Sequence, residues 1–129
     1  MSDPHPTEGE LAILHVLWRR HEPSTVREVH ESLIRNKDTA YTTVLKMMTI
    51  MAEKGLVNRD ESERSHRYAA VFPEPTVQSA MLNDLMQRAF SGSALQLVQR
   101  ALDTNTASSA DLDAISQMIA KAKARKGKV

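Results

Sequence analysis

The stretch Tyr41-Thr42-Thr43-Val44-Leu45-Lys46-Met47-Met48, which continues to Gly55-Leu56-Val57, decides the fold. Apolar side chains recur in it at helical spacing: Val44, Leu45, Met48 and Met51. This spacing predicts a helix with one face turned toward a core. Short hydrogen-bonding groups and one cation are left for the other face: Tyr41, Thr42, Thr43 and Lys46. A helix that enters the DNA major groove by its N-terminal end needs such groups. An ordinary amphipathic helix explains the segment equally well, so the flanking sequence must decide.

Two further helices are predicted before this segment. The first spans about residues 7–20 and opens with the capping box Thr7-x-x-Glu10, in which the two side chains satisfy free N–H groups of the first turn. The second spans about residues 24–35 and is capped by Ser24 or Thr25. The order of three short helices is that of a helix-turn-helix, whose last helix reads DNA.

A small β-hairpin is predicted after the glycine that ends the third helix, Gly55. Residues 56–59 and 66–71 form its strands, and the charged residues 60–65 form its loop, the wing. Three helices and a hairpin predict a winged helix-turn-helix, a mostly α fold with a small β-hairpin. Groups that can meet phosphate stand at the end of the wing: Arg64, His66 and Arg67. A solvated turn remains the alternative for these three residues.

A second, helical domain is predicted after Phe72-Pro73-Glu74-Pro75, whose two prolines indicate a stiff link. We expect a winged-helix DNA-binding domain over residues 1–73 and a helical dimerisation domain over residues 74–129. The second domain is too small for a comfortable core of its own. Its apolar stripes are therefore expected to pack against a second copy of the chain, or else against the first domain. The stripes comprise Val77, Met81, Leu82, Leu85, Phe90, Leu95, Val98, Leu102, Leu112, Ile115 and Ile119.

Composition limits the functions open to this chain of 129 residues. It has no cysteine, which excludes disulfides and thiolate chemistry. No apolar run approaches the ~20 residues that span a bilayer, so we expect a cytoplasmic protein without membrane insertion. The net charge is only +1, so DNA binding would require cations clustered on one face. The basic residues near the C-terminus are predicted to form a solvated, disordered tail: Lys121, Lys123, Arg125, Lys126 and Lys128.

No residue pattern indicates catalysis. The four glycines are not grouped into a phosphate-binding loop, and His30-Glu31 lacks the second histidine of a zinc-binding helix. Asp111 and Asp113 fall in the first turn of a predicted helix, where carboxylates complement the helix dipole. We expect no enzymatic activity, no metal site and no cofactor.

Three motifs together resemble the BlaI/MecI family of penicillinase and methicillin-resistance repressors: Ala40-Tyr41-Thr42-Thr43-Val44, Ala52-Glu53-Lys54-Gly55-Leu56-Val57 and Arg64-x-His66-Arg67-Tyr68. The resemblance is strong over residues 7–72 and continues as a helical pattern. It implies a homodimeric bacterial transcriptional repressor whose winged helices each read half of a palindromic operator in double-stranded DNA. By position, Tyr41, Thr42, Thr43 and Lys46 would face bases and nearby phosphates. Ser24 and Thr25 would meet the DNA backbone, and Arg64, His66 and Arg67 would serve the wing.

Departures from the family pattern narrow what the resemblance implies. Relatives often carry arginine where this chain has Thr49 and Ile50. Relatives induced by β-lactams are cleaved at an Asn-Phe bond, and the aligned bond here is Arg100–Ala101, which argues against that induction route. The copper-responsive branch needs cysteines that this chain lacks. The family still makes a membrane sensor-protease a candidate partner. The alternative function is a winged-helix protein–protein interaction module without specific DNA binding, because fold alone does not fix function.

Overall fold

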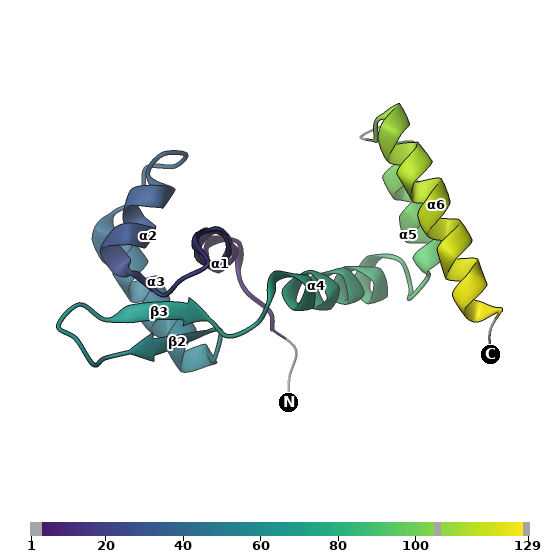
Figure 1. Cartoon of the computed structure of the whole chain (residues 1–129). Helices are drawn as coiled ribbons and strands as arrows, with labels where there is room; N and C mark the ends of the chain where they lie inside the picture. Colours follow the sequence, from purple (N-terminus) through teal and green to yellow (C-terminus); the bar gives the residue numbers. More distant parts are fainter. Residues whose placement is uncertain (1–3, 105–106, 128–129) are drawn as a thin grey trace. The chain divides into compact units, whose positions relative to one another are not determined.

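The computed structural model describes residues 4–104 and 107–127 and is mostly helical with one small sheet (Figure 1). Within these residues the elements follow the order α1 (Glu8–Arg20), β1 (Ser24–Thr25), α2 (Val26–Leu33), α3 (Tyr41–Lys54), β2 (Val57–Asp60), β3 (Arg67–Ala70), α4 (Glu74–Ala89), α5 (Ala94–Asp103) and α6 (Ser109–Lys126). Three helices followed by a hairpin confirm the predicted winged-helix architecture. The chain divides into two compact units, one ending at Asp84 and one beginning at Leu85. The division falls inside α4, and the domain boundary expected between residues 73 and 74 stays a prediction.

Local sequence signals set the ends of the first three helices. Capping boxes open α1, between Thr7 and Glu10, and α2, between Thr25 and Glu28. Gly55 ends α3 with φ +82°, a left-handed conformation that glycine adopts at little cost. These boundaries agree with the sequence, except that α2 ends at Leu33 rather than near residue 35.

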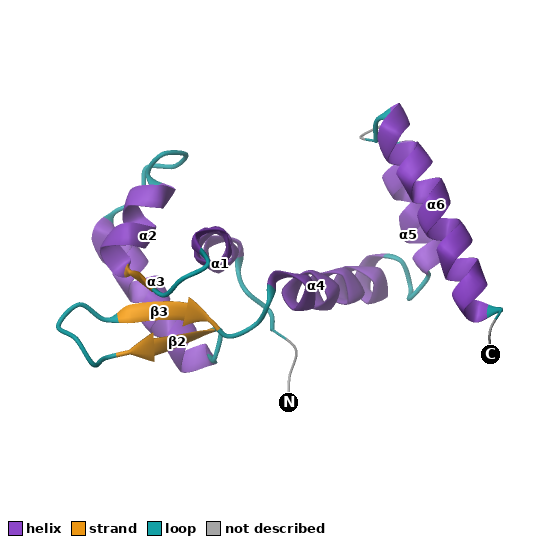
Figure 2. Ribbon diagram, in the orientation of Figure 1, coloured by secondary structure: helices purple, strands orange, loops and turns teal. Residues whose placement is uncertain are grey.

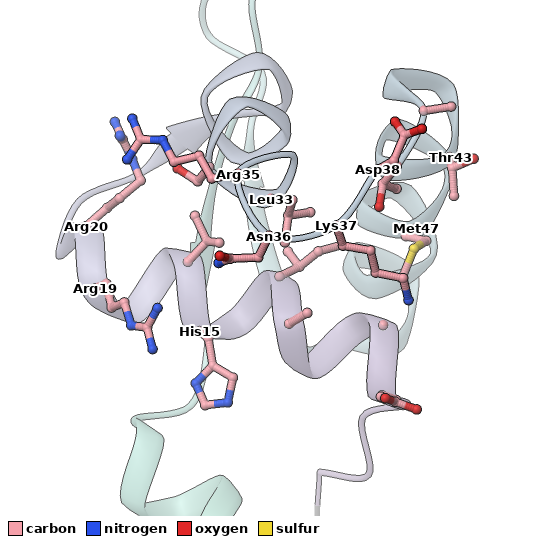
Figure 3. A pocket seen from close by; sticks show the side chains of 18 residues that line it. His15, Arg19, Arg20, Leu33, Arg35, Asn36, Lys37, Asp38, Thr43 and Met47 are labelled. Carbon is pink, nitrogen blue, oxygen red and sulfur yellow. The ribbon is translucent and has the colours of Figure 1, made fainter.

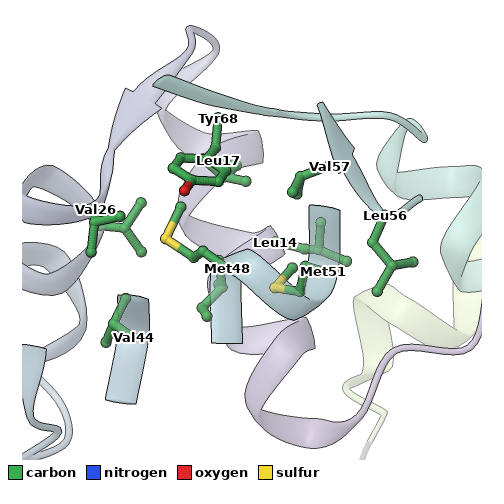
Figure 4. Packing of buried hydrophobic residues seen from close by; sticks show 11 residues of the cluster. Leu14, Leu17, Val26, Val44, Met48, Met51, Leu56, Val57 and Tyr68 are labelled. Carbon is green, nitrogen blue, oxygen red and sulfur yellow. The ribbon is translucent and has the colours of Figure 1, made fainter. Parts of the chain in front are cut away.

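The hydrophobic core of the first unit lies between α1, α2, α3 and the hairpin (Figure 4). Three residues of α3, Val44, Met48 and Met51, are fully buried in it. Tyr68 of β3 closes the core from the sheet side with 2% of its surface exposed. Leu45 was expected to face this core but is 41% exposed. At about 100° per residue, a side chain next to Val44 on the helix cannot share the centre of the buried face.

The sheet has three strands rather than the two that were predicted, in the order β1-β3-β2 (Figure 2). Both pairings are antiparallel, and Arg67 on the central strand lies opposite Thr25 on one side and Asp60 on the other. Strand β1 has only two residues, which is too short to show the alternation by which a strand is recognised in sequence. Its pairing joins the start of α2 to the hairpin, so the wing does not stand alone.

The segment with two prolines is a helix start and not the stiff link that was predicted. Helix α4 begins at Glu74 and includes Pro75 in its first turn. Proline is tolerated there because the first N–H groups of a helix have no partner within the helix. Three residues into the helix, Val77 is buried with 1% of its surface exposed. Val77 therefore packs within its own chain, and the structure removes it from the expected dimerisation set.

The second unit contains the end of α4 and the two helices that follow it. Ser91 and Gly92 separate α4 from α5 with φ +50° and +79°, and Ser93 caps α5. A capping box between Ser108 and Asp111 opens α6. No described residue of α5 or α6 is buried.

The basic C-terminal segment is helical as far as Lys126, so the prediction of a disordered tail was wrong for these residues. Alanine, lysine and arginine are good helix formers, and positive charge is favourable in the last turn of a helix. Lys128 lies outside the described residues. In the portion of the chain that the structure describes, no helix has both the length and the apolar character needed to cross a bilayer.

Candidate nucleic-acid interface

The face of α3 opposite the core carries two of the side chains that the sequence singled out, Thr42 and Lys46. Thr42 and Lys46 are exposed and lie one turn apart, so they project in similar directions. Tyr41 is 43% exposed at the start of the helix. Buried Val44 and Met48 hold the opposite face of α3 in the core, which fixes the direction of the exposed side chains.

The N-terminus of α3 is open, unlike the N-termini of α1, α2 and α6. Those three helices begin with capping boxes, whereas Ala40 precedes α3 and offers no side-chain acceptor. The first amide N–H groups of α3 can therefore meet an acceptor from outside the chain. His30 fixes the residues that lead into α3. Its Nε2 lies 2.7 Å from the Thr39 carbonyl oxygen, and its ring packs edge-on against the Tyr41 ring with the two ring centroids 5.6 Å apart.

A groove of about 390 Å³ lies between the start of α2, the start of α3 and the wing. It brings together four of the predicted residues: Thr25, Tyr41, Arg64 and His66. Leu45 also lines this groove, where an exposed apolar side chain can contact a thymine methyl group. Arg27 lines it as well and was missed from the sequence. The sequence feature that could have identified Arg27 is its position in the first turn of α2, two residues after the N-cap Thr25.

Ser24 does not belong to this surface, and its assignment to the DNA backbone was wrong. The residue is fully buried. Its hydroxyl accepts a hydrogen bond from Nε of Arg20 at 2.7 Å and donates one to the carbonyl oxygen of Glu22 at 3.1 Å. The side chain therefore fixes the turn between α1 and α2 and cannot reach a phosphate.

Thr25 is half-buried and uses its polar groups within α2. Its hydroxyl accepts the N–H of Glu28 at 3.2 Å, and its own N–H donates to the Glu28 carboxylate at 2.9 Å. This backbone bond and the charges of Arg20 and Arg67 hold the pKa of Glu28 below its ordinary value of 4.5. Thr25 can line the groove, but its cap must be kept for α2 to begin there.

The two arginines of the wing, Arg64 and Arg67, differ in whether they form an ion pair. Arg64 is exposed and forms no ion pair with any other described residue. Arg67 is half-exposed and lies 3.9 Å from the Glu28 carboxylate. The backbone N–H of Ser62 lowers the pKa of Asp60 at the end of β2, and the charges of Arg67 and His66 add to this.

Thr43 lies on a different side of α3 from the wing groove. With Met47 it lines a larger groove of about 860 Å³, between α1, the end of α2 and the link to α3 (Figure 3). The basic side chains of Arg19, Arg35 and Lys37 also line this groove. The predicted set is thus divided between the outward face of α3, the wing groove and this second groove, while Ser24 is buried and Arg67 lies beside Glu28.

Comparison with known proteins relates both the sequence and the fold to bacterial repressors. The model of the family described as "Penicillinase repressor" matches residues 6–121. Over 85 residues the chain is 44% identical to a protein from two strains of Mycobacterium tuberculosis named "Transcriptional regulator BlaI". That match covers 65% of this chain and 62% of the relative, so the chain spans less than two thirds of the relative's length.

A solved structure shares the fold: the monomeric form of Bacillus licheniformis BlaI in complex with the blaP half-operator. The TM-score is 0.50 at 21% sequence identity, and the match covers 58% of this chain and 90% of the other. The family is one of repressors, in agreement with the expectation of a non-enzymatic protein. Because the family model matches most of its length, this chain belongs to the penicillinase repressor family of transcriptional regulators, the BlaI/MecI family.

Proposed function

We propose that the chain is a dimeric transcriptional repressor that binds a palindromic DNA operator through its winged helix-turn-helix. The observation that carries this proposal is the outward face of α3, with its exposed Thr42 and Lys46 beside an uncapped helix start. Membership in a repressor family supports the same conclusion. A repressor of this kind acts in the cytoplasm, where the DNA is.

The proposed DNA-contacting residues lie on this face of α3 and around the wing groove. Thr42 and Lys46 face base edges and adjacent phosphates, and Tyr41 lies beside them at the start of the helix. Arg64 and His66 contact the DNA backbone from the wing. Arg27 adds a cation to the groove between the wing and the start of α3. Basic residues gather here although the net charge of the chain is only +1. The expected affinity is therefore strongly dependent on salt, because phosphate contacts release counterions.

The apolar stripes of residues 81–119 supply the proposed dimer interface. Helices α5 and α6 contain no buried residue in the single chain, yet several of their apolar side chains recur at helical spacing. Leu95 is 78% exposed, and Leu85 and Ile119 are about half exposed. Water contact at so many apolar side chains is unfavourable, and a second copy of the chain would remove it. The proposed interface consists of Met81, Leu82, Leu85, Phe90, Leu95, Val98, Leu102, Leu112, Ile115 and Ile119.

Derepression by a signal-dependent protease is the finer part of the proposal, with a membrane sensor-protease as the candidate partner. It rests on the family alone. The Arg100–Ala101 bond, which the family resemblance aligns with the Asn-Phe bond cleaved in relatives, lies within α5. A protease would have to accept a bond of different chemistry and unwind part of a helix to reach it.

The experiment that tests the proposal is a salt-dependent gel shift of the full chain on the DNA upstream of its own gene, followed by footprinting. A protected palindrome with half-sites about one helical turn apart is expected, together with a steep salt dependence. Uniform weak binding without a footprint on any fragment of the genome would contradict the proposal. It would favour the protein–protein interaction module instead, for which the small net charge of the chain is the supporting observation.

A further inference from the structure

Arg67 stands on the central strand of the sheet, between two acidic side chains from different elements. The strand register places it opposite Thr25 of β1 on one side and Asp60 of β2 on the other. Its Nη1 lies 3.9 Å from Oε1 of Glu28, the carboxylate that caps α2. Asp60 also feels its charge, which contributes to the lowered pKa of that carboxyl group. The cation is thus partly neutralised from both sides.

Glu28 is the other half of this arrangement because it joins three elements. One carboxylate oxygen accepts the N–H of Thr25 at 2.9 Å, and the other accepts Nη2 of Arg20 at 2.9 Å. Arg20 in turn holds the buried hydroxyl of Ser24 in β1. Asp60 accepts the N–H of Ser62 at 2.9 Å within the wing loop. Polar contacts therefore run from the end of α1 through the cap of α2 to Arg67 at the base of the wing, where the charge of Asp60 also acts on it.

From this geometry we propose that Arg67 is a positioning residue that anchors the wing to the start of α2 through Glu28, and that it does not contact phosphate. The inference rests on the proposed DNA-binding function and changes the role that the sequence gave to this arginine. Arg64 remains the phosphate-contacting arginine of the wing, because it is exposed and has no ion-pair partner among the described residues. The anchor sets the distance between wing and α3, and hence how both meet one half-site.

Substitution by glutamine separates these roles. Glu28→Gln keeps the cap of α2, because glutamine serves in capping boxes as glutamate does, but it removes the charge that attracts Arg67. Arg67→Gln removes the cation, and Arg64→Gln is the matched control on the same wing. Arg67→Lys restores the positive charge between the two carboxylates. Thermal unfolding first verifies that each variant is folded.

The first measurement is amide hydrogen exchange of the hairpin strands β2 and β3 in the free protein, because their paired N–H groups are hydrogen-bonded. Glu28→Gln and Arg67→Gln are expected to speed exchange in the hairpin, because each releases the same anchor. Arg64→Gln is expected to leave it unchanged, and Arg67→Lys is expected to restore slow exchange. Equal hairpin exchange in wild type, Glu28→Gln and Arg67→Gln would overturn the anchor. This readout needs no DNA, so it decides the anchor even if the chain binds none.

The second measurement is fluorescence anisotropy on a labelled duplex that covers the footprint, over a range of salt concentrations. Arg64→Gln should lower the slope of log affinity against log salt by about 0.9 per bound chain. Arg67→Gln should weaken binding about threefold, in the range of a partly exposed ion pair, with the slope unchanged. In the Glu28→Gln background it should have no further effect, because the two residues act as one unit. A slope that falls for Arg67→Gln as it does for Arg64→Gln would refute the inference. Failure of wild type to bind would instead refute the proposed function.

Discussion

Replacing Lys54 with methionine tests an ion pair between α3 and α1 in which Glu10 is buried and Lys54 is partly exposed. Nζ of Lys54 donates to Oε1 of Glu10 at 2.7 Å, and only 6% of the Glu10 side chain is exposed. The same oxygen accepts the N–H of Thr7 in the capping box. Methionine keeps most of the apolar stem of lysine but cannot neutralise the carboxylate, so the change isolates the charge.

The expected loss of unfolding free energy at neutral pH is about 1–3 kcal/mol, the usual cost of leaving a buried polar group without its partner. A further ~0.5 kcal/mol is expected because Lys54 lies in the last turn of α3, where positive charge complements the helix dipole. In a Glu10→Gln background only this smaller part should remain, because the amide of glutamine has no charge to neutralise.

The loss should also depend on pH in a defined direction. Burial raises the pKa of Glu10, but the hydrogen bonds from Lys54 and Thr7 and the charge of Lys54 outweigh burial and lower it below 4.5. A carboxyl group whose pKa is lowered by folding stabilises the protein above its ordinary pKa. That stabilisation is lost as the pH falls through the lowered value. The difference between wild type and Lys54→Met should therefore shrink on acidification.

Urea unfolding followed by circular dichroism measures this difference at neutral and at acid pH. Protein concentration must be held fixed, because the stability of a dimer depends on it. Two results would refute the reasoning: an equal loss at both pH values, or an equal loss in the presence and absence of Glu10→Gln. Either would mean that the side chain of Lys54 acts through packing rather than through its charge.

Four further substitutions probe the DNA-binding surface, the proposed dimer and the backbone. Lys46→Ala should weaken operator binding and lower the salt slope by about 0.9 per chain, and an unchanged slope in anisotropy titrations would exclude a phosphate contact. Leu85→Asp should yield monomers in sedimentation while Gln87→Asp, on the opposite side of α4, stays dimeric; a dimeric Leu85→Asp would exclude this stripe from the interface. Gly55→Ala should cost about 1 kcal/mol by urea unfolding, since φ is +82° there; no cost would mean that the turn can relax. Ser24→Ala should cost about 1 kcal/mol and leave the salt slope unchanged, whereas a lower slope would return this residue to the DNA surface.

The parts of the fold that depend on neighbouring residues were predictable from the sequence. The capping boxes at Thr7 and Thr25 and the glycine at residue 55 act over one helical turn, so their residue types mark the helix ends. The buried face of α3 follows from helical spacing, apart from Leu45 at its edge. The family resemblance assigned both Tyr41 and the wing residues to DNA, but the groove that joins them is a finding of the structure.

The features that the sequence did not reveal depend on residues far apart in the chain. Ser24 is buried because β1 pairs with β3, and nothing in two residues signals a strand. Arginine is a common phosphate-binding residue, and only the folded structure shows that Glu28 and Asp60 are acidic neighbours of Arg67. Val77 shares the spacing of the other stripe residues, yet it alone of the stripe is buried within the single chain.

The tryptophan of this chain gives it an internal spectroscopic reporter. The sequence contains one tryptophan, so its fluorescence comes from a single known place. The indole Nε1 of Trp18 in α1 donates a hydrogen bond at 3.0 Å to the carbonyl oxygen of Phe72, which lies just after the hairpin. The indole also packs edge-on against the His15 ring, with the ring centroids 5.4 Å apart. Release of the hairpin from α1 would expose this indole to water and shift its emission to longer wavelength. Movement of the hairpin relative to α1 can thus be followed by tryptophan fluorescence in the unlabelled protein, both with and without DNA.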